Sequence, residues 1–295
     1  MRARRPAAHR AGDLVSTALA IVLLLSGGSA AQNNIALATV LDRLHSYLAD
    51  YAERLPATIA SEHYIQRAGT GAQFQVSTLD SDFGIIRLPG VHEWLGFRDV
   101  LLKDGKAVSD HEKRLDTIFR NPSVTALEQA RLVTEESARH NVGPIYRTIN
   151  SPALVLELLD SRNSSRMRFR KSGEETIGQL RAWVIHFEEI SRPTIVRAIN
   201  SWNAPAKGRA WLDPATGRLM RAEAAVRAPG GAVRTGDFIG TVTVTFGNES
   251  RLGFWVPTAM TETYETTTFT MVASGEATYS NYRQFTVDAR VIVKP

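Results

Sequence analysis

A long run of strand-like segments in the second half of the chain constrains the fold most. From Thr241 to Phe246 threonine alternates with apolar residues, and a period of two sends successive side chains to opposite faces of a sheet. Such alternation is typical of an antiparallel sheet with one solvated face. Proline cannot donate to a strand ladder, so Pro257 is expected at an edge, a bulge or a strand end. The expected strands are, roughly, Asp237–Phe246, Phe254–Tyr264 and Phe269–Phe285.

Two hairpins precede these strands. In the first, pairing Met167 with Ile185 places Phe169 opposite Trp183 on an apolar face and leaves a charged face, where Arg166 lies beside His186 and diagonal to Glu188. The second runs through Arg209–Leu212, turns at Asp213–Gly217 and returns through Leu219–Val226. Aspartate, proline and glycine in one short stretch are typical of a turn.

The first half of the chain mixes helices with further strands. Apolar residues recur at helical spacing between Ile35 and Leu55, and Pro56 ends that helix. Further helices are expected at Glu112–Phe119, from Ala126 to about His140, and directly after Ser151-Pro152. Further strands are expected at Ile59–Arg67, Phe74–Leu79, Phe83–Leu88 and Leu95–Leu102, the last turning at Lys103–Lys106.

Helices gathered beside a long antiparallel meander predict an α+β fold. We expect one domain over residues 32–295, in which a strongly curved antiparallel sheet, an open half-barrel, wraps the N-terminal helix and a helical plug inserted at about 111–160. A chain of this length can bury a proper core in one domain.

Residues 1–31 have the three parts of a cleavable secretory signal. Four arginines precede an apolar run from Leu14 to Leu25, and small residues from Ser26 to Ala31 suit cleavage after Ala31. The apolar run is shorter than the roughly 20 residues of a permanent span, although a membrane anchor stays open as the alternative. We expect a periplasmic or secreted protein with no permanent membrane span after cleavage. The mature chain would hold 31 basic and 29 acidic residues, a net charge of +2.

The chain has no cysteine. This excludes disulfides, thiolate nucleophiles, cysteine-type zinc sites and a lipidated N-terminal cysteine. The domain must therefore fold by core packing alone, and the exported protein is expected to be untethered.

No motif predicts an enzyme, a metal site or a cofactor. A Gly-x-Ser-x-Gly elbow is missing, and the histidines form no helical zinc pair. His63 beside Glu62 and His92 beside Glu93 suggest acid–base chemistry, but adjacent strand residues point to opposite faces, which favours structural roles. A hydrolase whose groups converge in space stays open.

The strongest polar feature is an arginine stripe at Arg166, Arg168 and Arg170. These guanidinium groups could hold the anionic headgroup of a lipid or an acidic protein partner, or they could form a solvated face. Binding to nucleic acid would need aromatic residues on the same face, whereas Met167 and Phe169 point the other way. We therefore expect no nucleic-acid partner.

Aromatic residues that alternate into the sheet interior could line a pocket for an apolar ligand. The alternative is that they simply fill the core. The candidate ligand surface comprises Phe169, Trp183, Ile185, Phe187, Trp211 and Phe254.

The order of N-terminal helix, meander and inserted plug resembles the open half-barrel of the outer-membrane lipoprotein carrier proteins, the LolA/LolB-like superfamily, and their sigma-factor-regulator relatives. The stretch Ala210–Leu219 is similar to a hairpin of that group in which a strand ends in an aspartate turn. Phe97–Val100 with Asp104–Lys106, and Glu276–Tyr282, resemble uncharacterised secreted proteins of soil bacteria. The resemblance implies a concave apolar ligand surface and brings no catalytic residues.

The leading hypothesis from sequence is a non-enzymatic periplasmic binding or carrier protein for a lipid, a lipoprotein acyl chain or another amphiphile. The first alternative is an envelope scaffold or sensor that binds a protein through the charged sheet face. The second is the hydrolase with a convergent site.

Overall fold

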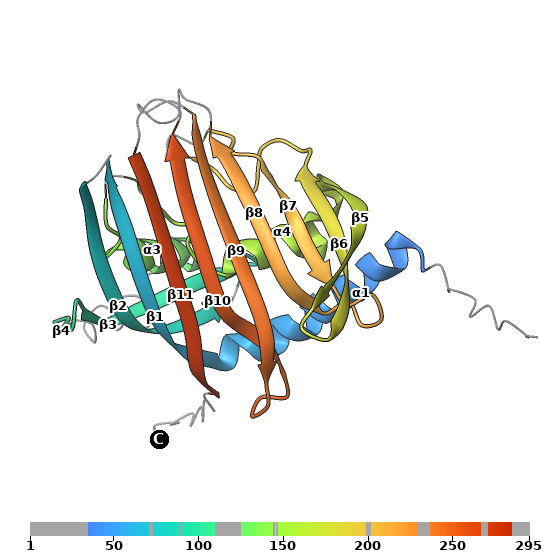
Figure 1. The fold of residues 1–295 in the computed structure, drawn as a ribbon, viewed down its shortest axis with the longest axis horizontal. Helices are drawn as coiled ribbons and strands as arrows, with labels where there is room; N and C mark the ends of the chain where they lie inside the picture. Colours follow the sequence, from blue (N-terminus) through green and yellow to red (C-terminus); the bar gives the residue numbers. More distant parts are fainter. Residues whose placement is uncertain are drawn as a thin grey trace, which may run out of the picture. The chain divides into compact units, whose positions relative to one another are not determined.

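An eleven-stranded antiparallel sheet organises the protein (Figure 1). The computed structural model describes residues 35–70, 73–88, 90–109, 125–143, 145, 147–198, 202–228, 237–266 and 271–284. The strands are β1 (Thr58–Thr70), β2 (Gln73–Ile86), β3 (Leu95–Lys103), β4 (Lys106–Ala107), β5 (Met167–Ile177), β6 (Leu180–Glu189), β7 (Ala206–Leu212), β8 (Leu219–Ala228), β9 (Phe238–Glu249), β10 (Phe254–Thr266) and β11 (Met271–Gln284).

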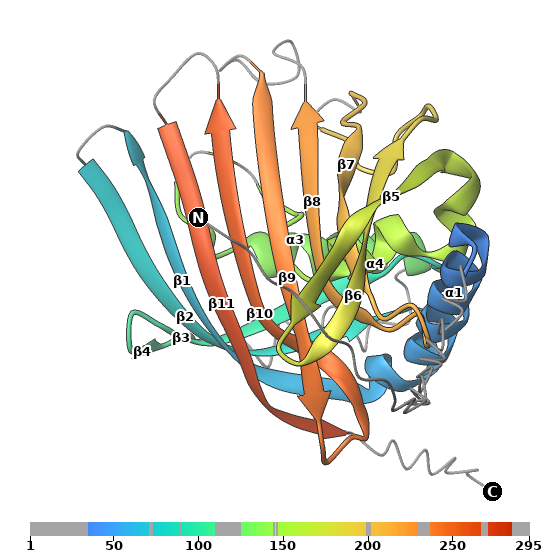
Figure 2. The ribbon, with the colours of Figure 1, turned by 45° about the vertical axis from the view of Figure 1, so that its right-hand side comes forward.

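The first and last of the described strands lie side by side within the sheet. The spatial order is β4-β3-β2-β1-β11-β10-β9-β8-β7-β6-β5, so β1 pairs with both β2 and β11 (Figures 1 and 2). The chain therefore leaves the sheet at one edge, β4, and returns at the other, β5. With neighbouring strands about 4.8 Å apart, this connection has to cross a sheet roughly 48 Å wide.

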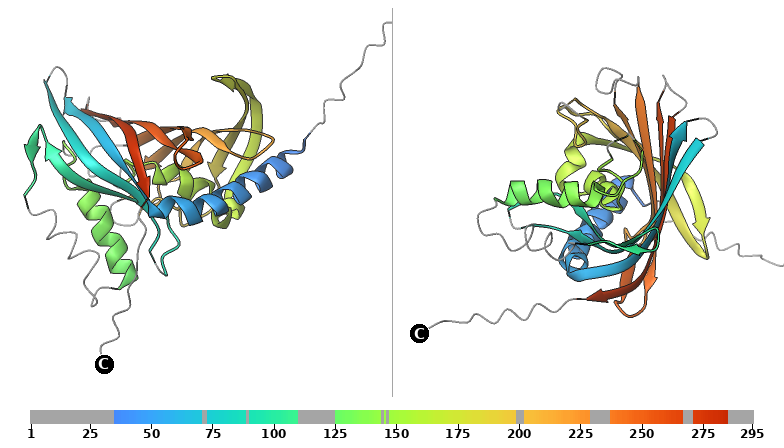
Figure 3. Two further views of the ribbon diagram at one scale, coloured as in Figure 1. Left: turned by 90° about the horizontal axis from the view of Figure 1, so that it is seen from below. Right: turned by 90° about the vertical axis from the view of Figure 1, so that its left-hand side faces the viewer.

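The helices in the described residues lie on one side of the sheet (Figure 3). They are α1 (Leu37–Arg54), α3 (Ala126–Ala138) and α4 (Ala153–Leu159), with 3-10 turns η1 (Leu55–Ala57) and η2 (Ser161–Arg166). The helices α3 and α4 belong to the connection between the two sheet edges. None of the helices in the described part of the chain is long and apolar enough to cross a membrane.

The main core lies between the inner face of the sheet and the helices. The helix α1 buries one stripe, from Val40 through Leu44 and Leu48 to Tyr51, as an amphipathic surface helix does. The Tyr51 ring meets Phe254 of β10 edge-on, with 5.8 Å between ring centroids. Six of the seven residues of α4 are buried, because this short apolar helix packs against β3, β8 and β9 of the sheet.

The outer face of the sheet is polar along β9. In β9 the side chains of Val242 and Val244 are buried, while Thr241, Thr243 and Thr245 are half-buried on the opposite face. The expectation of one solvated face is therefore confirmed. Pro257 lies at a register shift between β10 and β9, so the expected bulge is confirmed as well.

Two details of the expected strands differ from the structure. The two expected strands 74–79 and 83–88 are parts of one continuous strand, β2, which ends at Ile86, because the alternation of buried and half-buried side chains continues through Ser81. The predicted register of the first hairpin is wrong, since Met167 pairs with Glu189 and Phe169 pairs with Phe187. The tight turn after Ile177 fixes the pairing at Ile177–Leu180, and an irregularity between Lys171 and Gly173 shifts the rest.

The sheet is open at both edges and is not strongly curled, so the expectation of a strongly curved half-barrel is corrected. The expected α+β class and the expected antiparallel sheet are both confirmed. The proposed signal at 1–31 and the expected helix at 112–119 lie outside the described residues. Within the proposed insertion, α3 and α4 are present.

Candidate functional site

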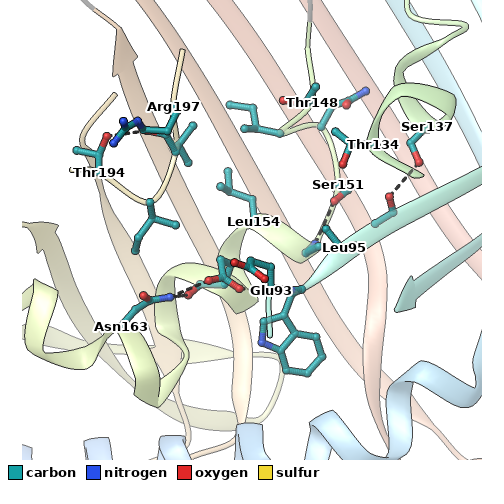
Figure 4. A pocket seen from close by; sticks show the side chains of 18 of the residues that line it. Glu93, Leu95, Thr134, Ser137, Thr148, Ser151, Leu154, Asn163, Thr194 and Arg197 are labelled. Atoms are coloured by element: carbon teal, nitrogen blue, oxygen red, sulfur yellow. Dashed lines mark hydrogen bonds between the residues drawn. The ribbon is translucent and has the colours of Figure 1, made fainter. Parts of the chain in front are cut away.

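A pocket of about 480 Å³ lies on the helix side of the sheet. It is lined by residues 93–98 at the start of β3, by α3, by the 148–151 segment, by α4 and by the 193–197 segment between β6 and β7 (Figure 4). Its apolar lining consists of Phe83, Trp94, Leu95, Ile149, Ala153, Leu154, Pro193, Ile195 and Val196. Pockets that take small ligands have volumes of about 300–1,000 Å³ and a mostly apolar lining with a few polar groups.

The charged groups of the lining are Glu93, Arg98, Glu157, Arg166 and Arg197. Three of them have a partner of opposite charge: Arg98 bonds Glu62, Glu157 lies 3.4 Å from Arg162, and Arg166 lies 3.6 Å from Glu189. These pairs fix the walls of the pocket.

Arg98 of β3 forms the deepest of these pairs. Its guanidinium donates two hydrogen bonds to the carboxylate of Glu62, and both side chains are essentially inaccessible to solvent. Burial alone would lower the pKa of Arg98, but the charge and hydrogen bonds of Glu62 outweigh it and raise that pKa. Arg98 also donates to the carbonyl oxygen of Asn150 over 3.3 Å. The pair therefore connects β1 and β3 to the segment that leads into α4.

A second buried pair holds the segment before α4 against the sheet. Nη1 of Arg147 donates to Oε1 of Glu262 on β10 over 3.0 Å, and Nη2 donates to Oε1 of Gln66 over 2.6 Å. The hydroxyls of Tyr64 and Tyr264 also donate to the Glu262 carboxylate. Burial raises the pKa of both tyrosines, so each hydroxyl keeps the proton that it donates.

The floor of the pocket is joined to α4 through Trp94. Its indole Nε1 donates to Oδ2 of Asp160 over 2.9 Å, and its backbone N–H donates to Glu157 over 3.0 Å. Burial opposes ionisation of Asp160, but hydrogen bonds from Arg162 and Trp94 outweigh it and lower the pKa of the carboxyl. The indole and the helix end are therefore fixed together.

The 193–197 segment forms another wall of the pocket. The buried carboxylate of Glu189 accepts hydrogen bonds from the backbone N–H groups of Ile195, over 2.7 Å, and Ala206, over 3.3 Å. Thr194 and Asn203 are joined by a hydrogen bond of 2.9 Å from the backbone N–H to Oδ1. The wall is therefore held from within the domain.

The hydroxyl groups of the lining support the backbone. The Ser137 hydroxyl donates to the carbonyl of Gly96 over 2.9 Å, and the Ser151 hydroxyl accepts from the N–H of Ala153 over 3.2 Å. The described residues contain no cluster of three or more histidine, aspartate or glutamate side chains that could hold a metal ion. The chemistry that the pocket offers is apolar contact together with charged and hydrogen-bonding groups.

The predicted apolar surface lies apart from this pocket. Trp183, Ile185, Phe187 and Phe254 are buried in the main core, and the half-buried Phe169 packs against it. Trp211 belongs to a separate apolar cluster with Val184 and Met220. None of the six lines the pocket; their role as a ligand surface stays a prediction.

The predicted arginine stripe is divided between two places. Arg166 ends η2 and lines the pocket, where its guanidinium donates to the carbonyl of Pro193. Arg168 and Arg170 are exposed on β5, and Arg168 lies 3.4 Å from Glu188. The structure therefore brings one of the three arginines to the candidate site.

The sequence analysis did not predict the two buried ion pairs, Arg98–Glu62 and Arg147–Glu262. The alternation of residues along the strands nevertheless contains a signal for them. Glu62 shares the buried face of β1 with Ala60 and Tyr64, and Glu262 lies between Met260 and Tyr264 on the buried face of β10. A charged residue in phase with buried apolar residues has to be paired.

No protein-family model and no curated protein matches the chain. In structure it is similar to a DUF1329 family protein from Desulfovibrio piger, with 11% sequence identity and a TM-score of 0.41; the similarity covers 84% of this chain and 92% of that one. It is also similar to a protein assigned as an outer membrane lipoprotein-sorting domain from Vibrio parahaemolyticus, with 15% identity and a TM-score of 0.36, over 84% of this chain and 92% of that one. It is also similar to a LolA superfamily protein from Nitrosomonas europaea (12% identity, 85% and 97%, TM-score 0.33). The expected resemblance is thus present at low sequence identity.

Proposed function

We propose that the protein binds an amphiphilic small molecule, such as a lipid or an acyl chain, in the pocket between β3, α3, α4 and the 193–197 segment. The observation that best supports this proposal is the composition of the pocket lining. Its lining contains apolar residues such as Leu154 and Val196 together with charged groups such as Arg166 and Arg197. An amphiphile has the matching division into an apolar and a polar part.

The walls of the pocket support a binding role. Buried hydrogen bonds fix the backbone around it through Arg98, Trp94 and Glu189. A site that is already formed before the ligand arrives loses less conformational entropy on binding. The protein would act as a binding or carrier protein in the envelope or outside the cell.

The pocket can be tested by filling it. Val196 is half-buried and lines the pocket, so Val196→Trp should occupy the space that a ligand would use. We expect the affinity for the neutral apolar dye Nile red to fall at least tenfold, measured as the rise in dye fluorescence on titration with purified protein. Tenfold corresponds to about 1.4 kcal/mol of binding free energy.

Ile190→Trp provides the matched control. Ile190 is an exposed β-branched residue that precedes the same segment and does not line the pocket. This variant should bind Nile red like the wild type. Equal affinity of all three proteins would contradict the proposed site, and failure of the wild type to bind Nile red and to carry any extractable lipid would contradict the proposed function.

The proposed location requires export and cleavage after Ala31. The mature protein recovered from the periplasm or the medium should begin at Gln32, which N-terminal sequencing or intact-mass measurement would show. An N-terminus at Met1 on protein in the membrane fraction would instead support an uncleaved anchor.

A further inference from the structure

We infer that the pocket selects amphiphiles whose polar end is an anion, a carboxylate or a phosphate, and that Arg197 is the group that recognises it. This inference rests on the proposed function and adds the chemical class of the ligand. Arg197 is exposed and lines the pocket.

Arg197 differs from the other arginines that line the pocket because each of those has an acidic partner. Arg98 is neutralised by Glu62, and Arg166 lies beside Glu189. Arg197 forms no side-chain hydrogen bond or ion pair with any residue in the described ranges. Its five N–H donors are therefore open to a ligand, water or salt ions.

The backbone that carries Arg197 is held in place although its side chain is free. Arg197 pairs with Asn203 in an isolated antiparallel β-bridge. The N–H of Ala198 donates to the carbonyl of Trp202 over 2.9 Å, and the N–H of Ala204 donates to that of Val196 over 3.3 Å. Two residues before Arg197, the backbone N–H of Ile195 donates to the buried carboxylate of Glu189. A ligand would therefore meet a cation whose main chain needs no rearrangement.

A second guanidinium, that of Arg166, contacts the 193–197 segment that carries Arg197. Nε of Arg166 is buried and has no acceptor among the described residues, although its Nη2 donates to Pro193. Arginine matches the geometry of carboxylate and phosphate with two parallel hydrogen bonds. This part of the lining thus offers several donors and one cation without a counter-charge.

The charges of the pocket also give a bound ligand a direction. Figure 4 shows Arg197 and Glu93 at separate places in the lining, with Leu154 between them in this view. An anion near Glu93 would be repelled, whereas an anion near Arg197 would be attracted. The acidic end of the ligand is therefore placed at the 194–197 segment and its chain over Leu154.

The test compares two ligands of equal chain length, decanoate and the neutral decanol, by their displacement of Nile red. The wild type should bind decanoate more tightly than decanol. Arg197→Gln should weaken decanoate binding about 5- to 20-fold, as expected for loss of a hydrogen-bonded charge contact of about 1–2 kcal/mol, and leave decanol binding unchanged. Inorganic phosphate alone should not displace the dye, because the apolar part supplies much of the affinity.

Two control variants separate this contact from a general effect of charge. Arg192→Gln removes an exposed arginine from the same segment, and Arg168→Gln removes one from β5; neither residue lines the pocket. Both should bind decanoate like the wild type. Circular dichroism and melting temperature of each variant show whether it is folded.

The outcomes distinguish this inference from the function on which it rests. If the wild type binds decanol and decanoate alike and Arg197→Gln alters neither, anion selection is wrong and the amphiphile pocket stands. An equal loss of decanoate binding in Arg192→Gln would overturn the assignment to Arg197. Binding of none of the three probes would overturn the proposed function itself.

Discussion

Replacing Arg147 by methionine is expected to destabilise the protein by about 3–5 kcal/mol. Arg147 and Glu262 are fully buried, with 3.0 Å between Nη1 and Oε1. Methionine would fill part of the space but would leave the Glu262 carboxylate buried without its counter-charge. Because a domain is stable by only about 5–15 kcal/mol, this one change removes a large part of the total.

The cost should depend on the unpaired charge more than on the lost contacts. Buried ion pairs are costly to break and often contribute little in net terms, since their attraction is offset by desolvation. The double variant Arg147→Met with Glu262→Gln should therefore recover at least half of the loss. The amide oxygen of the introduced glutamine would still accept a hydrogen bond from Tyr64 or Tyr264, whose hydroxyls donate to the Glu262 carboxylate in the native protein.

Urea unfolding gives the free energies directly, provided that the slope against urea concentration stays constant. Arg168→Met is the surface control, because Arg168 and Glu188 are both more than half exposed and such pairs contribute about 0–1 kcal/mol. A loss below about 1 kcal/mol in Arg147→Met would show that Glu262 is not held as described. The variant should also bind Nile red more weakly, since residues 148–151 line the pocket.

The elements of the fold were predictable where the periodicity was long. The stripe of α1 and the alternation in β9 gave both the type of each element and its buried face. The pairing of β1 with β11 was not predictable, because alternation determines which face is buried and contains no information about the neighbouring strand. This pairing leaves β4 and β5 at opposite edges and makes the connection between them cross the helix side of the sheet.

The predicted register between β5 and β6 is wrong for a local reason. Apolar residues of β5 and β6 can be aligned on one face in more than one way, and the choice depends on the turn and on irregularities. The irregularity between Lys171 and Gly173 has no distinct sequence pattern beyond the glycine itself. The predicted pairing of Met167 with Ile185 was therefore displaced although both strands were identified.

The candidate site was predicted in part. The arginine stripe gave Arg166, but Arg197 lies in an irregular segment with neither helical nor strand periodicity, so nothing in the pattern connected it to a pocket. The aromatic residues were expected either in a ligand surface or in the core. Trp183 and Phe187 are buried in the core, where packing gives them ample structural reason to be present.

Gly217 occupies a position at which even a methyl group is expected to be costly. It closes the turn from Asp213, which the sequence predicted, and its φ is +74°. A Cβ there would lie 2.1 Å from the carbonyl carbon of Arg43 and 2.3 Å from the backbone nitrogen of Leu44, both in α1. We expect Gly217→Ala to lower the free energy of unfolding by about 2–5 kcal/mol, from the left-handed backbone and the forced displacement of the helix.

Gly105 separates these two causes. It has the same φ of +74° in the turn between β3 and β4, but its Cβ would meet nothing within 4 Å. Gly105→Ala should therefore cost about 1–2 kcal/mol, the backbone contribution alone. The additional loss of unfolding free energy in Gly217→Ala, beyond that in Gly105→Ala, measures the contact between this turn and α1. The same contact includes a hydrogen bond of 2.6 Å from Arg43 to the carbonyl of Pro214. Hydrogen exchange should then show weaker protection of α1 in Gly217→Ala alone. Equal losses in the two variants would mean that the turn does not hold the helix, and that α1 depends on its apolar stripe for its position.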